Sequence, residues 1–311
     1  MTAGATRRLT GTNRENLTMA YDIAADIRLD PRLKTMLAGI AAEMAGDVDS
    51  REALLAEENS DEARKQAELF RSFMDLCDTE EAAPSAGLRV HTEKVVSQPD
   101  GNSINLQVIR PDNAETVSCV YYIHGGGMAS LSCYDGMYRG WGKIIAANGV
   151  AVVMVDFRNC VVASSVPEVA PFPAGLNDCV SGLKWIVANA GQLNIDPARI
   201  IVAGESGGGN LTLATGLKLR QDGDLGLIQG LYALCPYIRG EWPTPECPSS
   251  TENNGILLDL HNNRGAVGYG IEAFKERNPL AWPSFATAQD VEGFPPTVIS
   301  VNECDPLRDE G

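Results

Sequence analysis

The chain has 311 residues, 41 acidic and 25 basic, and its formal net charge at pH 7 is −16. This charge repels phosphate backbones and anionic lipid headgroups, so we expect no nucleic-acid partner. Apolar runs such as GVAVVMV at 149–155 are far shorter than the roughly 20 residues that a membrane span requires. The amino terminus lacks the apolar region of a secretory signal, and we expect a cytoplasmic protein without a membrane span.

Residues 17–82 have a helical and strongly charged pattern. Apolar residues at three- and four-residue spacing predict one stripe along a helix. We therefore expect residues 1–85 to form an amino-terminal helical cap segment. The residues of the predicted stripe are Ala63, Ala67, Phe70, Met74 and Cys77.

After residue 87 the pattern changes to short β-rich runs. LRVHTEKVV and INLQVIR are separated by the turn-forming SQPDGNS, which predicts an antiparallel hairpin. Further apolar strands alternate with helical segments, and this alternation is typical of a mostly parallel central sheet flanked by helices. The expected strands are 119–123, 150–156, 200–203, 230–235 and 297–301.

These elements predict one α/β core over residues 86–311. The stretch 237–290 interrupts the alternation, because it is rich in Pro, Asn, Trp and Gly and has one helical run near 255–274. We interpret it as an insertion that covers the active face of the core.

The pentapeptide GESGG at 204–208 lies between an expected strand and a helical run. A serine at a sharp turn from strand to helix is the context of a nucleophile elbow. The flanking positions favour glycine because strand and helix pass close together there, and the helix amino terminus can stabilise an oxyanion. Ser206 is therefore the candidate nucleophile, with the N–H of Gly207 as an oxyanion donor.

YYIHGGGM at 121–128 also follows an expected strand. Its three consecutive glycines expose backbone N–H groups that could hold an oxyanion, and Gly126 and Gly127 are the candidate donors. A simple glycine-rich turn or a phosphate-binding loop is the alternative. It is disfavoured because no Gly-Lys-Ser or Gly-Lys-Thr follows.

Asp305 follows the expected strand 297–301 and would lie at the carboxyl edge of the sheet, where doubly wound folds build their sites. We predict it to be the acid of a catalytic triad. Glu303 and Asp309 are weaker alternatives. Cys304 is the only cysteine that we expect near this chemistry, and we expect it to serve in packing.

HGGG, GESGG and DPLRDEG occur in this order and resemble the hormone-sensitive lipase family of carboxylesterases, bacterial family IV. VDFRN at 155–159 and EVAPFPAGLNDC at 168–179 resemble further family segments, so the resemblance covers about 85–311. It implies an α/β-hydrolase fold with a helical cap, no metal or organic cofactor, and short-chain esters as substrates. Glu205 and Gly207 depart from the commoner Asp and Ala of the family. The implied site consists of Ser206 and Asp305 as catalytic residues, Gly126, Gly127 and Gly207 as the oxyanion hole, and His124 and Gly125 as support for the oxyanion loop.

The family order places a catalytic histidine after Asp305, and the printed sequence has none there. We expect His124 to hold the oxyanion loop and His91 to occupy an exposed strand position. His261 precedes the acid in the sequence. It remains an alternative candidate for the base, because the same triad geometry arises from several chain orders. We therefore expect the last strand and helix of the fold, and the catalytic histidine, to lie beyond Gly311.

Two functions follow from these predictions. The first is a serine carboxylesterase that acts through an acyl-enzyme on a small-molecule ester. The second is a receptor-like protein of the same fold that binds a small ligand without catalysis, because it lacks the histidine. Two further partners stay open. One is a second copy of the chain in a homodimer, and the other is a separate carboxyl-terminal fragment that carries the histidine.

Overall fold

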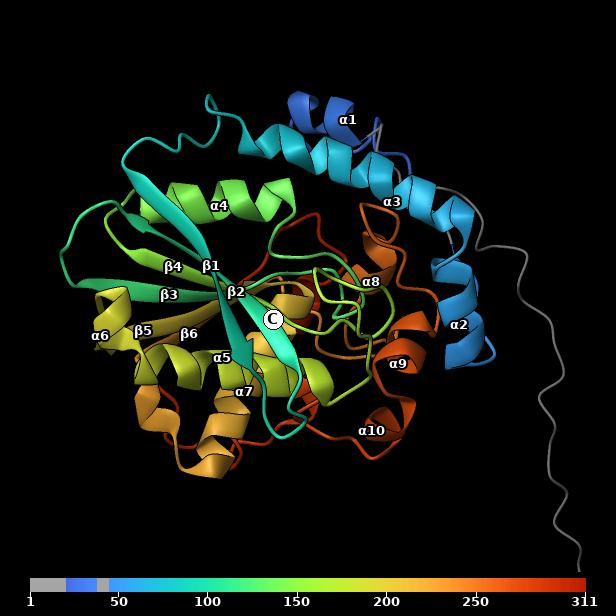
Figure 1. Ribbon diagram of the computed structural model, residues 1–311. Coiled ribbons are helices and arrows are strands. Elements are labelled where there is room, and N and C mark those ends of the chain that lie inside the picture. Colours follow the sequence, from blue (N-terminus) through green and yellow to red (C-terminus); the bar gives the residue numbers. More distant parts are fainter. Residues whose placement is uncertain (1–20, 38–44) are drawn as a thin grey trace, which may run out of the picture.

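The computed structural model describes residues 21–37 and 45–311, and its centre is a mixed β-sheet (Figure 1). The strand order in the described chain is β1-β2-β4-β3-β5-β6-β7. β1 pairs antiparallel with β2 and β2 antiparallel with β4, whereas the remaining pairs are parallel. The predicted hairpin and the mostly parallel sheet are thus confirmed. The strands are β1 (Leu88–Val96), β2 (Ser103–Pro111), β3 (Val117–Ile123), β4 (Ala151–Asp156), β5 (Ile195–Glu205), β6 (Gly230–Leu234) and β7 (Thr297–Ser300).

Helices cover both faces of the sheet (Figure 1). One face carries α4, and the opposite face carries α5 and α7. Every residue of β4 is buried, as expected for an interior strand whose two faces are covered by helices, and this explains the apolar run at 151–155. The helices of this core are α4 (Gly136–Ala146), α5 (Ala174–Ala188), α6 (Ala190–Leu193) and α7 (Gly207–Asp222), with a 3-10 turn η2 at Leu225–Leu227.

The amino-terminal helices are α1 (Pro31–Leu37), α2 (Arg51–Glu58) and α3 (Asp61–Met74), followed by the 3-10 turn η1 (Asp75–Asp78). The predicted apolar stripe on α3 is largely wrong, because Met74 is 2% exposed but Phe70 is 40% exposed and Cys77 is also exposed. The reason is that only the carboxyl end of α3 packs closely on α4, where Gly136 faces the backbone of Met74 and Asp75. The predicted helical residues 17–20 and 38–44 lie outside the described chain.

The segment 237–290 contains short helices instead of the one predicted near 255–274. These are α8 (Ser249–Glu252), α9 (Arg264–Tyr269) and α10 (Ile271–Lys275), with a 3-10 turn η3 at Pro283–Phe285. The prediction fails because Gly270, at φ 159° and ψ 89°, separates α9 from α10. Before α9, the Asn254 and Asn262 side chains accept hydrogen bonds from the N–H groups of Leu260 and Arg264, which competes with helix formation.

Large aromatic side chains join this segment to the sheet. Trp242, Tyr269 and Trp282 belong to the same buried cluster as the strands.

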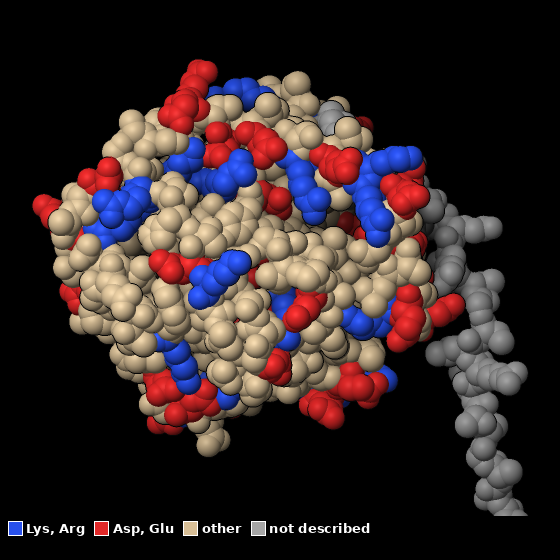
Figure 2. All heavy atoms as spheres, viewed as in Figure 1, with Lys and Arg blue, Asp and Glu red and all other residues tan. Residues whose placement is uncertain are grey.

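None of the helices in the described residues has the length and apolarity that crossing a bilayer requires. On the face drawn in Figure 2, basic side chains are interspersed among the acidic ones, so the negative net charge does not form one continuous acidic surface there.

Candidate active site

The turn between β5 and α7 forces Ser206 into an unusual backbone conformation. Its φ is 56° and its ψ is −117°, and a positive φ is uncommon for a residue with a side chain. A Cβ at Gly204 would overlap the carbonyl oxygen of Gly208, and a Cβ at Gly208 would overlap that of Ile123. The two glycines therefore let strand and helix approach closely enough to form the predicted elbow.

The glycine loop after β3 packs directly on this elbow. Gly126 and Gly127 have φ values of 89° and 61°, which glycine adopts without steric cost. A Cβ at Gly207 would lie 2.7 Å from the Gly127 nitrogen and 2.5 Å from the Met128 nitrogen. The structure thus brings Gly127 and Gly207 together, as the resemblance implies, while their role as oxyanion donors stays a prediction.

His124 lies beneath this loop and is completely buried. Its Nδ1 is 3.0 Å from the Gly125 carbonyl oxygen, and its ring stacks on Phe157 with centroids 4.3 Å apart. Burial lowers the pKa of His124, although Asp156, with Oδ1 4.0 Å from Nε2, acts in the opposite direction. These contacts hold the imidazole against the loop, while its burial favours the neutral form.

Tyr138 and Glu205 form a second support for the loop, which the sequence analysis missed. The Gly125 N–H donates to the Tyr138 hydroxyl at 3.0 Å, and this hydroxyl donates to Glu205 Oε2 at 3.0 Å. Burial raises the pKa of Glu205, the Tyr138 hydrogen bond lowers it, and the nearby Asp305 carboxylate raises it further. Glu205 could have been found inside GESGG, but nothing in the sequence connects Tyr138 to it.

Asp305 lies in the loop after β7 and is partly buried. Its Oδ1 accepts a hydrogen bond from the Leu307 N–H at 2.8 Å. Burial raises the pKa of Asp305, whereas the Leu307 N–H and the Cys235 thiol lower it. The Ser206 N–H donates to the Leu234 carbonyl oxygen of β6, and the residue after Leu234 donates to Ser300 at the end of β7. The loop that carries Asp305 therefore leaves the sheet at the edge where the elbow lies.

The cysteine beside the acid is Cys235, so the expectation that only Cys304 would lie there is wrong. Cys235 directly follows β6, and its N–H donates to Ser300 of β7 at 2.7 Å. Parallel pairing of β6 and β7 therefore brings it to the same edge as Asp305. Burial, and to a smaller extent the charge of the Asp305 carboxylate, raises the pKa of Cys235 to about 12. Cys304 instead packs on the cluster that includes Tyr21.

The alternative acids have other partners. Glu303 is exposed and lies 3.7 Å from Arg308 and 3.9 Å from Arg28. Asp309 pairs with Arg308 at 2.8 Å and accepts a hydrogen bond from the Ser249 N–H at 2.7 Å. These contacts engage Glu303 and Asp309 away from Ser206, and Asp305 stays the predicted acid.

The remaining histidines point elsewhere. His91 Nε2 lies 3.3 Å from Glu93 on β1, and His261 Nε2 lies 2.9 Å from the Ser250 carbonyl oxygen. Within residues 21–37 and 45–311, no hydrogen bond joins a histidine to Ser206 or Asp305. The same residues contain no group of three or more His, Cys, Asp and Glu side chains that could hold a metal ion.

Residues 120–311 match a family model described as alpha/beta hydrolase fold. Carboxylesterase NlhH of Mycobacterium tuberculosis is 32% identical over 206 residues, which are 63% of this chain and 59% of that protein. A structure of esterase Est22 with p-nitrophenol shares 64% identity at a TM-score of 0.90, covering 93% of this chain and 84% of that one. Brefeldin A esterase, a bacterial homologue of human hormone sensitive lipase, shares 33% identity at a TM-score of 0.80, with 92% and 80% covered.

Proposed function

Since the chain belongs to the alpha/beta hydrolase fold family, we propose that it is a serine carboxylesterase that hydrolyses short-chain esters through an acyl-enzyme. The observation that carries this proposal is the packing of the glycine loop on the Ser206 elbow. It places the backbone nitrogens of Gly127 and Met128 against Gly207, next to the serine. Backbone donors fixed beside a nucleophile suit a reaction that develops an oxyanion.

In the proposed reaction, Ser206 Oγ attacks the ester carbonyl and forms a tetrahedral intermediate. The N–H groups of Gly126, Gly127 and Gly207 stabilise its oxyanion. The intermediate expels the alcohol, which takes up the proton that left Ser206, and the acyl group stays on the serine. Water then attacks the acyl-enzyme in the same way and releases the carboxylic acid.

We propose that the base in this reaction is a histidine oriented by Asp305, and that neither His124 nor His261 is that base. This is supported by the position of His124, which is buried against the Gly125 carbonyl oxygen, and by that of His261, whose Nε2 lies beside the Ser250 carbonyl oxygen. Each of these ring nitrogens has a backbone carbonyl oxygen as its partner instead of Ser206. A separate fragment that carries the histidine would satisfy the same requirement.

A receptor-like function is the second candidate, and the absence of a histidine contact at Ser206 in the described residues is the observation in its favour. In such a protein the residues around Ser206 would bind a small ligand without turnover. Ester hydrolysis by the protein from its full reading frame therefore decides between the two candidates.

The decisive experiment is hydrolysis of p-nitrophenyl acetate by the full-length protein and its Ser206→Ala variant. We expect the variant to lose about 10³-fold or more in kcat, because loss of a triad nucleophile costs several orders of magnitude. Ser181→Ala is a matched control, since Ser181 lies on α5 and hydrogen bonds to Gln98. A Ser206→Ala enzyme with more than a few per cent of the original kcat would refute the assignment.

Two further measurements test the finer parts. In a chain-length series of p-nitrophenyl esters, rates that rise steadily toward long acyl groups would contradict the short-chain substrate. Residues 1–311 alone should be nearly inactive beside the full-length protein, because a serine without a base is a weak nucleophile at neutral pH. Equal kcat/KM values for both would show that His261 or another group within the 311 residues acts as the base.

A further inference from the structure

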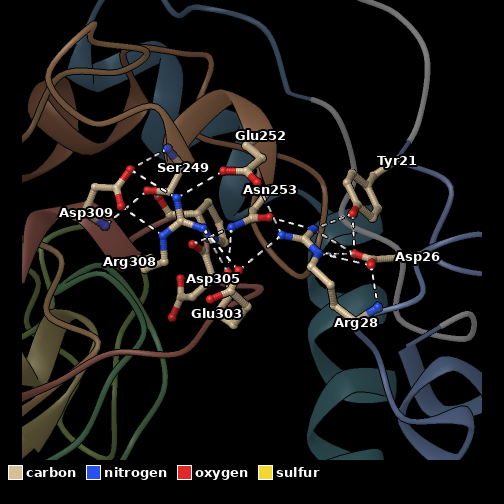
Figure 3. Close-up of polar contacts among 11 residues, drawn as sticks. Tyr21, Asp26, Arg28, Ser249, Glu252, Asn253, Glu303, Asp305, Arg308 and Asp309 are labelled. Atoms are coloured by element: carbon tan, nitrogen blue, oxygen red, sulfur yellow. Dashed lines mark hydrogen bonds and ion pairs between the residues drawn. The ribbon is translucent and has the colours of Figure 1, made fainter.

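The loop 303–309, which carries Asp305, is held by residues that lie far from it in the sequence. Figure 3 shows Glu252 and Asn253, at the carboxyl end of α8, between Arg28 of the amino-terminal segment and the loop residues Asp305 and Arg308. Asn253, the residue that caps the carboxyl end of α8, is completely buried beside the loop. The contacts therefore join three segments of the chain at one point.

Arg28 is fixed in place within its own segment. Its guanidinium donates to both carboxylate oxygens of Asp26, at 3.0 Å to Oδ1 and 2.7 Å to Oδ2, and to the Tyr21 hydroxyl at 2.9 Å. The Tyr21 hydroxyl in turn donates to Asp26. The hydrogen bonds from Arg28, ahead of that from Tyr21, hold the pKa of Asp26 well below its ordinary value. A planar guanidinium held at several points has little freedom to turn.

From this position Arg28 fixes the orientation of the Asn253 amide. Arg28 Nη2 donates to Asn253 Oδ1 at 2.9 Å. The opposite side of the amide, Nδ2, then faces the loop and donates to the carbonyl oxygens of Glu303 at 3.1 Å and Asp305 at 3.0 Å. Every polar atom of this buried side chain thus has a partner, and rotating the amide by 180° would set N–H groups against Arg28 and an oxygen against two carbonyls.

Arg308 holds the opposite side of the loop. Its guanidinium donates to the Glu303 carbonyl oxygen at 3.2 Å and to Glu252 of α8 at 3.0 Å. Asp309 adds two hydrogen bonds with Ser249. These contacts join the core to segment 237–290. Arg28 is the residue through which the amino-terminal segment acts on the backbone of the acid loop, by way of Asn253.

We propose that Arg28 is a positioning residue, which acts through Asn253 to fix the backbone at Asp305 and so makes the acid competent only when the amino-terminal segment is docked. This inference rests on the proposed esterase function for its kinetic consequence. The hydrogen-bonded path from Asp26 through Arg28 and Asn253 to the Asp305 carbonyl is independent of that function. We refer to this path as the Arg28 clamp.

The test uses the full-length protein with Arg28→Ala, Arg28→Lys and Asn253→Asp. Asn253→Asp keeps the acceptor for Arg28 but removes both donors to the loop. Arg28→Lys keeps the charge but loses the planar fork. Arg32→Ala is the matched control, because Arg32 pairs with Asp30 two residues before it, as Arg28 does with Asp26, and its side chain is 91% exposed. Thermal unfolding of each variant shows whether it is folded.

Two readouts are needed, amide hydrogen exchange of peptides that cover 302–310 and the kinetics on p-nitrophenyl acetate. We expect faster exchange in this loop for all three variants but not for Arg32→Ala. We also expect kcat to fall by about 10-fold to 10²-fold with KM nearly unchanged, because a small displacement of a catalytic group has effects of this size. Combining Arg28→Ala with Asn253→Asp should cost little more than either alone, since both break one path.

Unchanged exchange over 302–310 in folded Arg28→Ala or Asn253→Asp protein would overturn the clamp. Faster exchange with wild-type kcat would also overturn it, because the contact would then be structural and would not position the acid. Wild-type kinetics for Arg28→Lys would show that charge alone suffices, which contradicts positioning by the fork. If the unmodified protein hydrolyses no ester, the proposed function fails, and the exchange measurement still decides whether the clamp exists.

Discussion

The Ser206 side and the Asp305 side of the candidate site are built in different ways. At the elbow, glycines remove the Cβ atoms that would otherwise collide with the backbone of a neighbouring segment. At the acid loop, Asn253 after α8 and Arg308 of the loop itself donate hydrogen bonds to backbone carbonyls, and Arg28 of the amino-terminal segment holds Asn253. One side depends on steric fit and the other on polar contacts between distant segments.

This difference has consequences for sequence and for chemistry. Steric fit between adjacent segments requires particular residues at fixed spacing, and such a requirement appears as a motif. Polar contacts across the chain require only that suitable groups meet in the fold, and they leave no local pattern. Carboxylates on the acid side also titrate, so this side should respond to pH while the glycines do not.

The largest effect should come from Asp305→Asn, which leaves the shape of the acid side intact but removes its charge. We expect kcat on p-nitrophenyl acetate to fall by about 10³- to 10⁴-fold, because an amide cannot hold a triad histidine in its productive tautomer. Asp309→Asn is the control, since Asp309 pairs with Arg308 and Ser249. An equal or larger loss for Asp309→Asn would transfer the role of the acid to that residue.

The steric side can be broken with one methyl group, through Gly207→Ala. The new Cβ would lie 2.5 Å from the Met128 nitrogen, so the glycine loop must move away from the elbow. We expect kcat to fall by about 10²-fold, the scale of losing one oxyanion donor. Gly191→Ala adds the same atom where nothing lies within 4 Å and should leave kcat unchanged. A fully active Gly207→Ala enzyme would show that the loop has room to adjust.

Glu310 should make the acid side sensitive to pH. Its carboxylate accepts hydrogen bonds from the Ile238 and Arg239 N–H groups and from the Trp242 indole. Burial raises its pKa from 4.5 to about 7, against these hydrogen bonds, which lower it. The folded chain therefore binds this proton more tightly than the unfolded chain does. The resulting stability is complete below about pH 4.5 and is lost as the pH rises through about 7.

Urea unfolding at about pH 5 and about pH 8 measures this effect. Glu310 should lower the free energy of unfolding by up to ~3 kcal/mol across that interval. Glu310→Gln lowers stability at both pH values, because its amide nitrogen faces a donor, but it should remove this part of the slope. Glu241→Gln, a nearby exposed position, should keep the slope. A Glu310→Gln protein with the full wild-type slope would contradict the linkage.

The smallest effect should come from Tyr138→Phe, which removes a polar link between the glycine loop and the elbow. Without the hydroxyl, the Gly125 N–H and the Glu205 carboxylate lose their common partner. We expect a loss of about 1–3 kcal/mol in stability and a several-fold lower kcat. Tyr134→Phe is the control, because its hydroxyl contacts only the exposed Thr92. A stability loss equal to that of the control would show that the link is dispensable.

Much of the fold could be predicted because its signals are local. Alternating apolar runs located β3 to β7, and the turn residues between the first two β-rich runs located the hairpin. The residues 204–208 and 124–127 were found because close backbone approach demands glycine. The two glycine-rich segments lie close together because β3 and β5 pair in parallel, which brings the carboxyl ends of both strands to one edge of the sheet.

The errors have equally physical causes. The stripe on α3 was misjudged because apolar spacing does not show which part of a helix packs against another element. In α3 only the end near Met74 packs closely on α4. Cys235 was overlooked because its proximity to Asp305 depends on the β6–β7 register. The Arg28 clamp could not be predicted, since an arginine and an asparagine 225 residues apart carry no signal that they meet.

That separation has a consequence for synthesis on the ribosome. Arg28 leaves the ribosome 225 residues before Asn253, and at about 5–20 residues per second this corresponds to roughly 10–50 s. The β1–β2 hairpin, whose strands adjoin in the sequence, can close during that time. The amino-terminal segment can dock on α8 and the acid loop only afterwards. The contacts at Asp305 can then form only after the residues of the elbow have left the ribosome.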